Sequence, residues 1–153
     1  MAFALAGIMN RGNRKSPGDR CPIDRTMQVV GTRSAILLMR EALFGTSRFD
    51  DFVVRTGLTD AVVAARLRDL VQAGLLSKEP YREPGQRTRH AYALTDSGRD
   101  LMPAVLALGQ WGAKHARGAV GRTFRHVECG EPVRTVVECT AHHRPAVEQI
   151  EVS

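Results

Sequence analysis

The sequence has few of the features that mark secreted, membrane or disulfide-stabilised proteins. Its 153 residues include three cysteines, Cys21, Cys129 and Cys139, and this odd number at wide spacing argues against a disulfide framework. No apolar run is long enough to span a bilayer. The apolar residues 1–9 are followed, not preceded, by basic residues, unlike a secretory signal. We therefore expect a cytoplasmic protein with no membrane partner.

Motifs typical of enzymes are also missing. The chain has no glycine-rich nucleotide-binding loop, no serine–histidine–aspartate arrangement and no paired carboxylates in a supporting context. Four of its five histidines fall at or beyond His115, outside the part of the chain with recognisable motifs. The sequence therefore predicts a protein that is not an enzyme.

What the chain does have is positive charge. The net charge is +6, in a composition that is 43% hydrophobic and 25% charged, as in ordinary globular domains. Such a balance favours an anionic partner without identifying it. The placement of the basic residues is more informative, because they gather before the fold and on one expected hairpin: Arg11, Arg14, Lys15, Arg20, Arg82, Arg87 and Arg89.

The middle of the chain has the pattern of a helix–turn–helix. A first helix is expected over about 24–43, and a short helix over about 50–54 is expected to be capped by Ser47. After the Thr56-Gly57 turn, Thr59 is a good cap for a helix that runs to about Ala73. Its apolar stripe of Val63, Leu67 and Leu70 predicts docking on the core, while the opposite face carries Ala61, Ala65, Arg68 and Gln72.

A basic hairpin and a long helix are expected next. Residues 75–79 and 90–94 are strand candidates on either side of the Pro84-Gly85 turn. Thr95 is expected to cap a helix over about 96–117, which Pro103 kinks or delays. Its long stripe of Leu101, Val105, Leu108 and Trp111 either packs on a second subunit or covers its own domain. A helix that can enter a groove, followed by an arginine-bearing hairpin, predicts a winged helix that binds DNA.

The same residues resemble a family. Over about residues 21–115 the chain has, in this order, Cys21-Pro22, Val30-Gly31, residues 38–45, 48–52 and 66–70, Gly74-Leu75, 92–95 with Gly98, and Trp111. Together these motifs resemble the HxlR family of bacterial transcription regulators. The resemblance implies a winged-helix fold related to MarR proteins, a homodimer built from terminal helices, and binding to an inverted-repeat operator as repressor or activator. Gly31-Thr32-Arg33-Ser34 departs from the family's usual Gly-Gly-Lys-Trp, and the missing tryptophan alters the local packing.

The residues expected to contact DNA lie on two elements and at two helix starts. The recognition helix is unusually bare, so Arg68 and Thr59 are its main polar groups, whereas alanine methyls can meet thymine methyls. We therefore expect specificity to depend on the wing and on DNA shape, with Arg87 and Arg89 near a minor groove. The full set of expected contacts is Ser47, Arg48, Thr59, Ala61, Ala64, Ala65, Arg68, Arg87 and Arg89.

Cys21 has two interpretations. HxlR relatives often carry a cysteine at this position, and in several of them it senses electrophiles or oxidants. A thiolate is favoured by positive charge and by a helix N-terminus, and here Arg20 and Arg25 flank the residue at an expected helix start. The alternative is a small buried residue at a helix start or dimer contact.

The tail beyond Gly118 lies outside the resemblance. Strands are expected over 122–129, 134–139 and 146–152, with a turn at residues 130–132. Two pairs at ligand spacing, His126 with Cys129 and Cys139 with His142, could hold a structural Zn²⁺, although His143 competes with His142. The alternative is a degenerate zinc ribbon that has no metal. No other cofactor is expected.

The sequence thus predicts a mainly α-helical fold with a small β component. Residues 1–20 form a flexible basic arm, residues 21–117 a winged helix–turn–helix domain whose terminal helices dimerise, and residues 118–153 a small β appendage. The expected function is that of a dimeric, sequence-specific transcriptional regulator that binds double-stranded DNA and responds to a small effector or to thiol oxidation. The alternative is a winged-helix protein-interaction module without operator binding.

Overall fold

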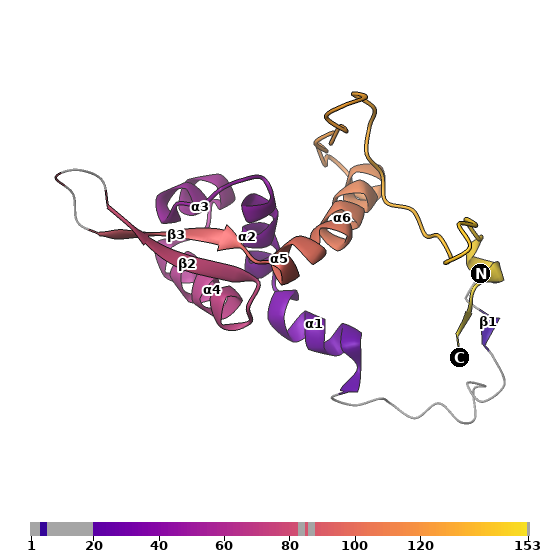
Figure 1. Cartoon of the computed structure of the whole chain (residues 1–153), viewed down its shortest axis with the longest axis horizontal. Helices are drawn as coiled ribbons and strands as arrows, with labels where there is room; N and C mark the ends of the chain where they lie inside the picture. Colours follow the sequence, from indigo (N-terminus) through magenta and orange to yellow (C-terminus); the bar gives the residue numbers. More distant parts are fainter. Residues whose placement is uncertain (1–3, 6–19, 83–84, 86–87, 153) are drawn as a thin grey trace. The chain divides into compact units, whose positions relative to one another are not determined.

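The chain folds into two compact units in a computed structural model that describes residues 4–5, 20–82, 85 and 88–152. One unit is Cys21–Gly121, and the other joins both ends of the chain, Met1–Arg20 and Arg122–Ser153. The first unit carries the helices and the hairpin that the sequence predicts (Figure 1). Within the described ranges, no helix has the length and apolar character that a membrane span requires.

The first expected helix is in fact two, α1 (Pro22–Val30) and α2 (Arg33–Leu43). Gly31 ends α1 and donates its N–H to the Met27 carbonyl at 2.8 Å. Thr32 is extended, and its hydroxyl accepts a hydrogen bond from the Ala35 N–H at 3.1 Å, which starts the next helix. The expectation of one continuous helix over 24–43 is therefore wrong, because a cap residue directly follows a helix-ending glycine.

The helix–turn–helix consists of α3 (Phe49–Thr56) and α4 (Asp60–Gln72). Gly57 joins them with a left-handed φ of 66°, a conformation that glycine adopts without steric cost. Thr59 caps α4 as predicted. The expected Ser47 cap is wrong: Arg48 occupies the N-cap position of α3 and makes no side-chain cap bond. Ser47 lies one residue too early and instead uses its carbonyl to accept the Tyr92 N–H at 2.8 Å.

The core lies between α2, α3, α4 and the hairpin. The predicted stripe on α4 is confirmed, because Val63, Leu67 and Leu70 have no exposed surface. They pack with Phe52 of α3 and with α2 side chains such as Leu38, both also fully buried. Each such side chain contributes roughly 1.5–3 kcal/mol by leaving water. This packing fixes one side of α4 and leaves the other side available.

The wing is an antiparallel pair of strands, β2 (Leu76–Tyr81) and β3 (Arg89–Leu94), as the sequence predicts but longer towards the tip. The register pairs Leu76 with Leu94 at the base and Tyr81 with Arg89 at the far end. Arg48 forms an isolated antiparallel bridge with Ala91. The start of α3 is thereby fastened to β3 by backbone hydrogen bonding.

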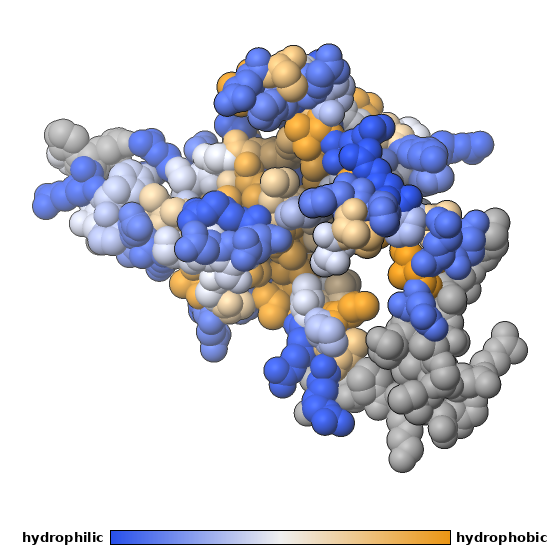
Figure 2. All heavy atoms as spheres, turned by 45° about the vertical axis from the view of Figure 1, so that its right-hand side comes forward, coloured by the Kyte–Doolittle hydropathy of each residue, from blue (hydrophilic) through white to orange (hydrophobic). Residues whose placement is uncertain are grey.

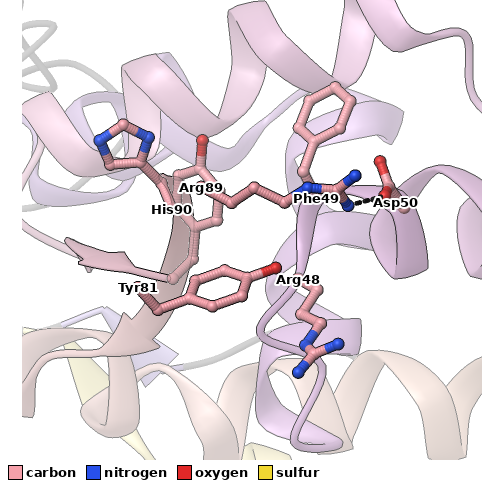
Figure 3. A pocket seen from close by; sticks show the side chains of 7 residues that line it. Arg48, Phe49, Asp50, Tyr81, Arg89 and His90 are labelled. Atoms are coloured by element: carbon pink, nitrogen blue, oxygen red, sulfur yellow. Dashed lines mark hydrogen bonds and ion pairs between the residues drawn. The ribbon is translucent and has the colours of Figure 1, made fainter. Parts of the chain in front are cut away.

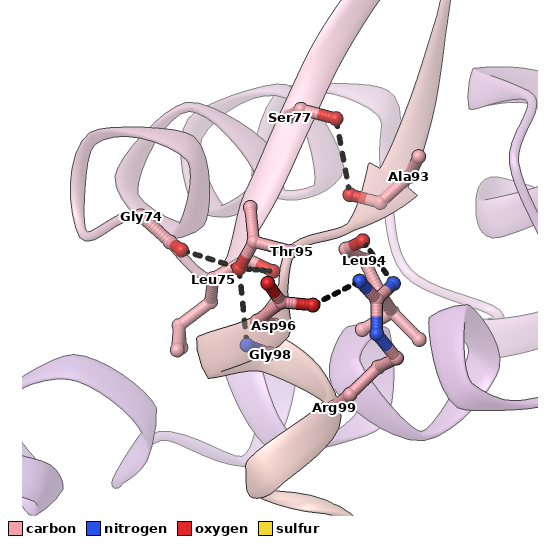
Figure 4. Close-up of polar contacts among 9 residues, drawn as sticks. All are labelled: Gly74, Leu75, Ser77, Ala93, Leu94, Thr95, Asp96, Gly98 and Arg99. Carbon is pink, nitrogen blue, oxygen red and sulfur yellow. Dashed lines mark hydrogen bonds and ion pairs between the residues drawn. The ribbon is translucent and has the colours of Figure 1, made fainter.

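The last helical segment is also divided, into α5 (Asp96–Asp100) and α6 (Met102–His115). The break at Leu101 matches the later start that Pro103 allows, since proline is tolerated in a first helical turn. Thr95 caps α5, and its hydroxyl accepts from the Gly98 N–H at 3.1 Å and donates to the Gly74 carbonyl at 2.6 Å (Figure 4). A Cβ on Gly98 would collide with the Leu75 carbonyl oxygen, so the wing base and α5 pack backbone to backbone.

The second unit differs from the expectation of three tail strands. Over residues 122–139 it contains a turn closed by one isolated bridge between Arg125 and Pro132, and residues 146–152 contain a 3-10 helix (Val147–Gln149) and β4 (Glu151–Val152). β4 pairs in parallel with β1 (Ala4–Leu5). The first two predicted strands are wrong and the third is confirmed only at β4, because nearly every described tail side chain is exposed and a sheet without a buried face is not stable.

The N-terminal arm is also partly ordered. The expectation of a structureless arm over 1–20 is wrong at Ala4–Leu5, which form β1. Its other expected features, including Arg11, Arg14 and Lys15, lie outside the described residues.

Candidate nucleic-acid interface

The outward face of α4 carries the side chains predicted to meet DNA bases. Ala61, Arg68 and Gln72 are exposed, whereas Ala64 and Ala65 are half-buried. Thr59 is exposed at the N-terminus of the helix, where its side chain is already engaged as a cap. The outward face of α4 therefore consists mostly of small apolar side chains, and Arg68 is its long cationic side chain.

The two arginines of this helix are in different environments. Arg66 forms an ion pair with Asp69 at 2.8 Å, one helical turn further on. Within the part of the chain that the structure describes, Arg68 has no ion-pair partner, and its side chain is exposed. Arg68 can therefore contact a base edge without first giving up an internal partner, and guanine is the base that arginine pairs with best.

Arg89 lies on a strand of the wing and not at its tip, where the sequence suggests a position near the tip. Arg87 and the residues around Pro84 lie outside the described residues. Arg89 is the first residue of β3, directly across from Tyr81, and not part of the loop at the tip. Its guanidinium Nη1 lies 2.9 Å from Asp50 Oδ2 at the start of α3. A minor-groove contact by Arg89 stays a prediction, but the side chain has a partner elsewhere.

Arg48 faces the same space from the other side. Its guanidinium lies over the ring of Tyr81, with Cζ 5.2 Å from the ring centroid. This distance is within the range in which a cation is attracted to an aromatic face. The bridge to Ala91 fixes the backbone from which this side chain extends.

A hollow of about 300 Å³ lies between the wing base and the start of α3. Figure 3 shows Arg89 reaching across to Asp50, with the Tyr81 ring between Arg89 and Arg48. His90 and Tyr92 also line the hollow. Burial raises the pKa of the Tyr92 phenol, whose ring packs edge-on against Phe52 at 6.1 Å.

Sequence reasoning missed Asp50, Tyr81 and His90 as part of this site. Asp50 was seen only as a helix residue, and Tyr81 and His90 fell at or beyond the expected strand ends. No local sequence signal could have found Asp50, because its contact with Arg89 joins positions 39 residues apart.

An apolar surface is left on α6 and α1. Of the predicted stripe, Leu101 and Val105 are half-buried, whereas Leu108 and Trp111 are 59% and 64% exposed. Leu106, which the sequence analysis did not single out, is the buried residue of this helix. Ile23 and Met27 of α1 are exposed as well. Figure 2 shows apolar side chains uncovered in the middle of the face it presents.

Cys21 occupies the N-cap position of α1 and is half-buried with a free thiol. Its backbone carbonyl accepts the Arg25 N–H at 3.0 Å, which closes the first helical turn. The thiol thus lies at the N-terminus of α1, as the sequence predicts.

The predicted zinc ligands remain as two separate pairs. His126 Nδ1 lies 3.2 Å from Cys129 Sγ, but His142 Nδ1 is hydrogen-bonded to Glu138 Oε1 at 2.8 Å. Over the described ranges, no three histidine, cysteine or acidic side chains gather where they could hold a metal. The hydrogen bond from His142 lowers the pKa of Glu138. As placed here the four residues do not form one site, and zinc binding stays a prediction.

Comparison with known proteins agrees with this architecture. Residues 29–119 match the HxlR-like helix-turn-helix family. An uncharacterized HTH-type transcriptional regulator of Mycobacterium tuberculosis is 37% identical over 140 residues, which cover 90% of this chain and 84% of the relative.

Solved structures extend the likeness. PA1607, a candidate transcription factor, is 32% identical with a TM-score of 0.78, over 89% of this chain and 96% of that chain. The redox regulator HypR in its reduced form is 28% identical with a TM-score of 0.56, over 63% and 94% of the two chains. These matches confirm the predicted winged helix–turn–helix fold. The chain belongs to the HxlR-like helix-turn-helix family of transcriptional regulators.

Proposed function

We propose that this regulator is a dimer that binds an inverted-repeat operator in double-stranded DNA with sequence specificity. The observation that carries the proposal is the exposure of α4: one side is fully buried in the core, and the other presents Arg68 beside alanine methyls. A helix held in this way can enter a major groove, and the following hairpin can contact the backbone beside it.

The exposed part of α6 supports the dimer. Leu108 and Trp111 are large apolar side chains that a monomer leaves in water. A second copy covering them would place two α4 helices on one DNA duplex, and half-sites one helical turn apart would follow from the two-fold symmetry. Terminal-helix dimers are also what membership of this family leads us to expect.

A binding experiment tests the function. Purified protein is titrated against the DNA upstream of its own gene and against a random duplex, by gel shift and footprinting, over a range of salt concentrations. We expect a protected inverted repeat and an affinity that falls steeply between about 50 and 200 mM salt, because phosphate contacts release counterions. Absence of binding at low salt would remove the proposal.

The signal that controls binding is proposed to be thiol oxidation at Cys21 or a small effector held near the dimerising helices. Support comes from the helix-cap position of the thiol and from the similarity to HypR, a redox regulator. In the oxidative step the Cys21 thiolate attacks one oxygen of hydrogen peroxide, which yields a sulfenic acid and hydroxide.

A peroxide titration separates the two signals. DNA binding of the wild type should change after peroxide and recover after a thiol reductant, whereas Cys21→Ser should not respond. A response that survives in Cys21→Ser would assign the oxidation to another cysteine. Unchanged binding in the wild type would leave the small effector as the signal.

A further inference from the structure

We propose that the hollow between α3 and the wing base binds one backbone phosphate of DNA, and that Asp50 acts there as an internal competitor for Arg89. This site deepens the proposed DNA-binding function and rests on it. In this proposal Arg89 exchanges the carboxylate of Asp50 for a DNA phosphate when the protein binds DNA.

The geometry brings two cations to one space from two elements. Arg89 enters from the end of β3 and Arg48 from the start of α3, and the Tyr81 ring lies between them (Figure 3). The bridge between Arg48 and Ala91 holds both backbones in fixed register. The hollow of about 300 Å³ is open to solvent and large enough for a phosphodiester group.

The charge balance selects an anion. Among the lining residues, Arg48 and Arg89 are positive and Asp50 alone is negative, while His90 and the two tyrosines add polar groups. Guanidinium groups bind phosphate oxygens through paired N–H donors, so two arginines around one hollow suit a phosphate. In the free protein the Asp50 carboxylate occupies this role, with Oδ2 at 2.9 Å from Arg89 Nη1.

The ion pair is weak enough to be exchanged. The side chains of Arg89 and Asp50 are 55% and 72% exposed, and exposed pairs contribute little to stability. Asp50 therefore keeps Arg89 extended across the hollow in the absence of DNA, and a phosphate can displace the carboxylate. The cost of this displacement lowers the affinity for every DNA sequence equally, because phosphate contacts carry no base information.

Asp51 provides a matched control. It follows Asp50 in the first turn of the same helix, carries the same charge and is exposed, but it does not line the hollow. Asp50→Asn and Asp51→Asn remove the same net charge from the same helix end. Any difference between the two variants therefore reports the partner of Arg89 and not the general attraction of DNA to a more basic protein.

The test measures affinity for a fluorescein-labelled random-sequence duplex by anisotropy across a salt series. We expect Asp50→Asn to bind about two- to fivefold more tightly than Asp51→Asn, the range that an exposed ion pair gives. This extra gain should vanish in the Arg89→Gln background. Arg89→Gln and Arg48→Gln should each reduce the salt slope by about one, with no change in base preference.

Each outcome decides the proposal. Equal effects of Asp50→Asn and Asp51→Asn, or a gain that persists without Arg89, would overturn it. Weaker binding by Asp50→Asn would overturn it too, because Asp50 would then only position the wing. Arg99→Gln, which breaks a similar exposed pair with Asp96 at the start of α5, should leave the slope unchanged. If the wild type binds no DNA at all, the proposed function fails together with this site.

Discussion

The hydroxyl of Thr95 connects three segments, and its removal should destabilise the domain more than the loss of an ordinary helix cap. The oxygen accepts the Gly98 N–H at 3.1 Å and donates to the Gly74 carbonyl at 2.6 Å, with the Leu75 carbonyl at 3.1 Å (Figure 4). Thr95→Ala removes the cap, worth about 1 kcal/mol. It also removes the donor to the end of α4, worth about 0.5–1.5 kcal/mol net.

The expected loss in the free energy of unfolding is therefore roughly 2 kcal/mol, which shifts Tm by about 8–16 °C in a domain of this size. Urea unfolding followed by far-UV circular dichroism measures it directly. Thr95→Ser should restore most of the stability because it keeps the oxygen. Thr32→Ala should lower the free energy of unfolding by only about 1 kcal/mol. The Thr32 hydroxyl caps α2 by accepting the Ala35 N–H, a single hydrogen bond to the backbone. If Thr95→Ala costs no more than Thr32→Ala, or if serine is as harmful as alanine, the three-segment role is refuted.

Three further predictions concern the site and its surroundings. Arg68→Ala should weaken operator binding by about 1–3 kcal/mol while leaving random DNA nearly unaffected, as competition gel shifts will show; an equal loss on both would make Arg68 a phosphate contact. Leu108→Glu and Trp111→Ala should each shift the protein towards monomer in light scattering, and an unchanged mass would place the dimer contact elsewhere. Burial raises the pKa of Tyr92, so the unfolded state ionises first and stability should fall as pH rises above about 10; Tyr92→Phe should flatten that loss in urea titrations, and an unchanged slope would contradict it.

The elements predicted well from the sequence are those with both a start signal and a buried face. Thr59 marks the beginning of α4, and the spacing of Val63, Leu67 and Leu70 fixes which side faces the core. Cap chemistry and burial act here in the same direction, so local sequence is sufficient. The wing is similar, because the Pro84-Gly85 turn signal stands between two short strand patterns.

The wrong predictions of helices and strands occur where the spacing of apolar residues does not show whether a helix or strand continues. Apolar residues on both sides of Gly31 keep a helical period, which hides the break before the Thr32 cap. In the tail, residues such as Val127 and Val137 are β-branched, as is typical of strands, but their side chains are exposed. Strand pairing there is therefore not stabilised by side-chain packing.

The phosphate site could be predicted only in part. Arg48 and Arg89 stand out as basic residues near a helix start and a hairpin. Their relation to Asp50 depends on a contact between positions 39 residues apart, which no local pattern contains.

In the proposed DNA complex, the bare outer face of α4 is also a convenient surface for engineering new operator specificities. Ala61 is exposed, favours helix and is absent from the buried core, so a longer polar side chain there adds contacts without repacking the domain. Asparagine or glutamine at this position would add donors and acceptors suited to adenine beside the proposed contact of Arg68.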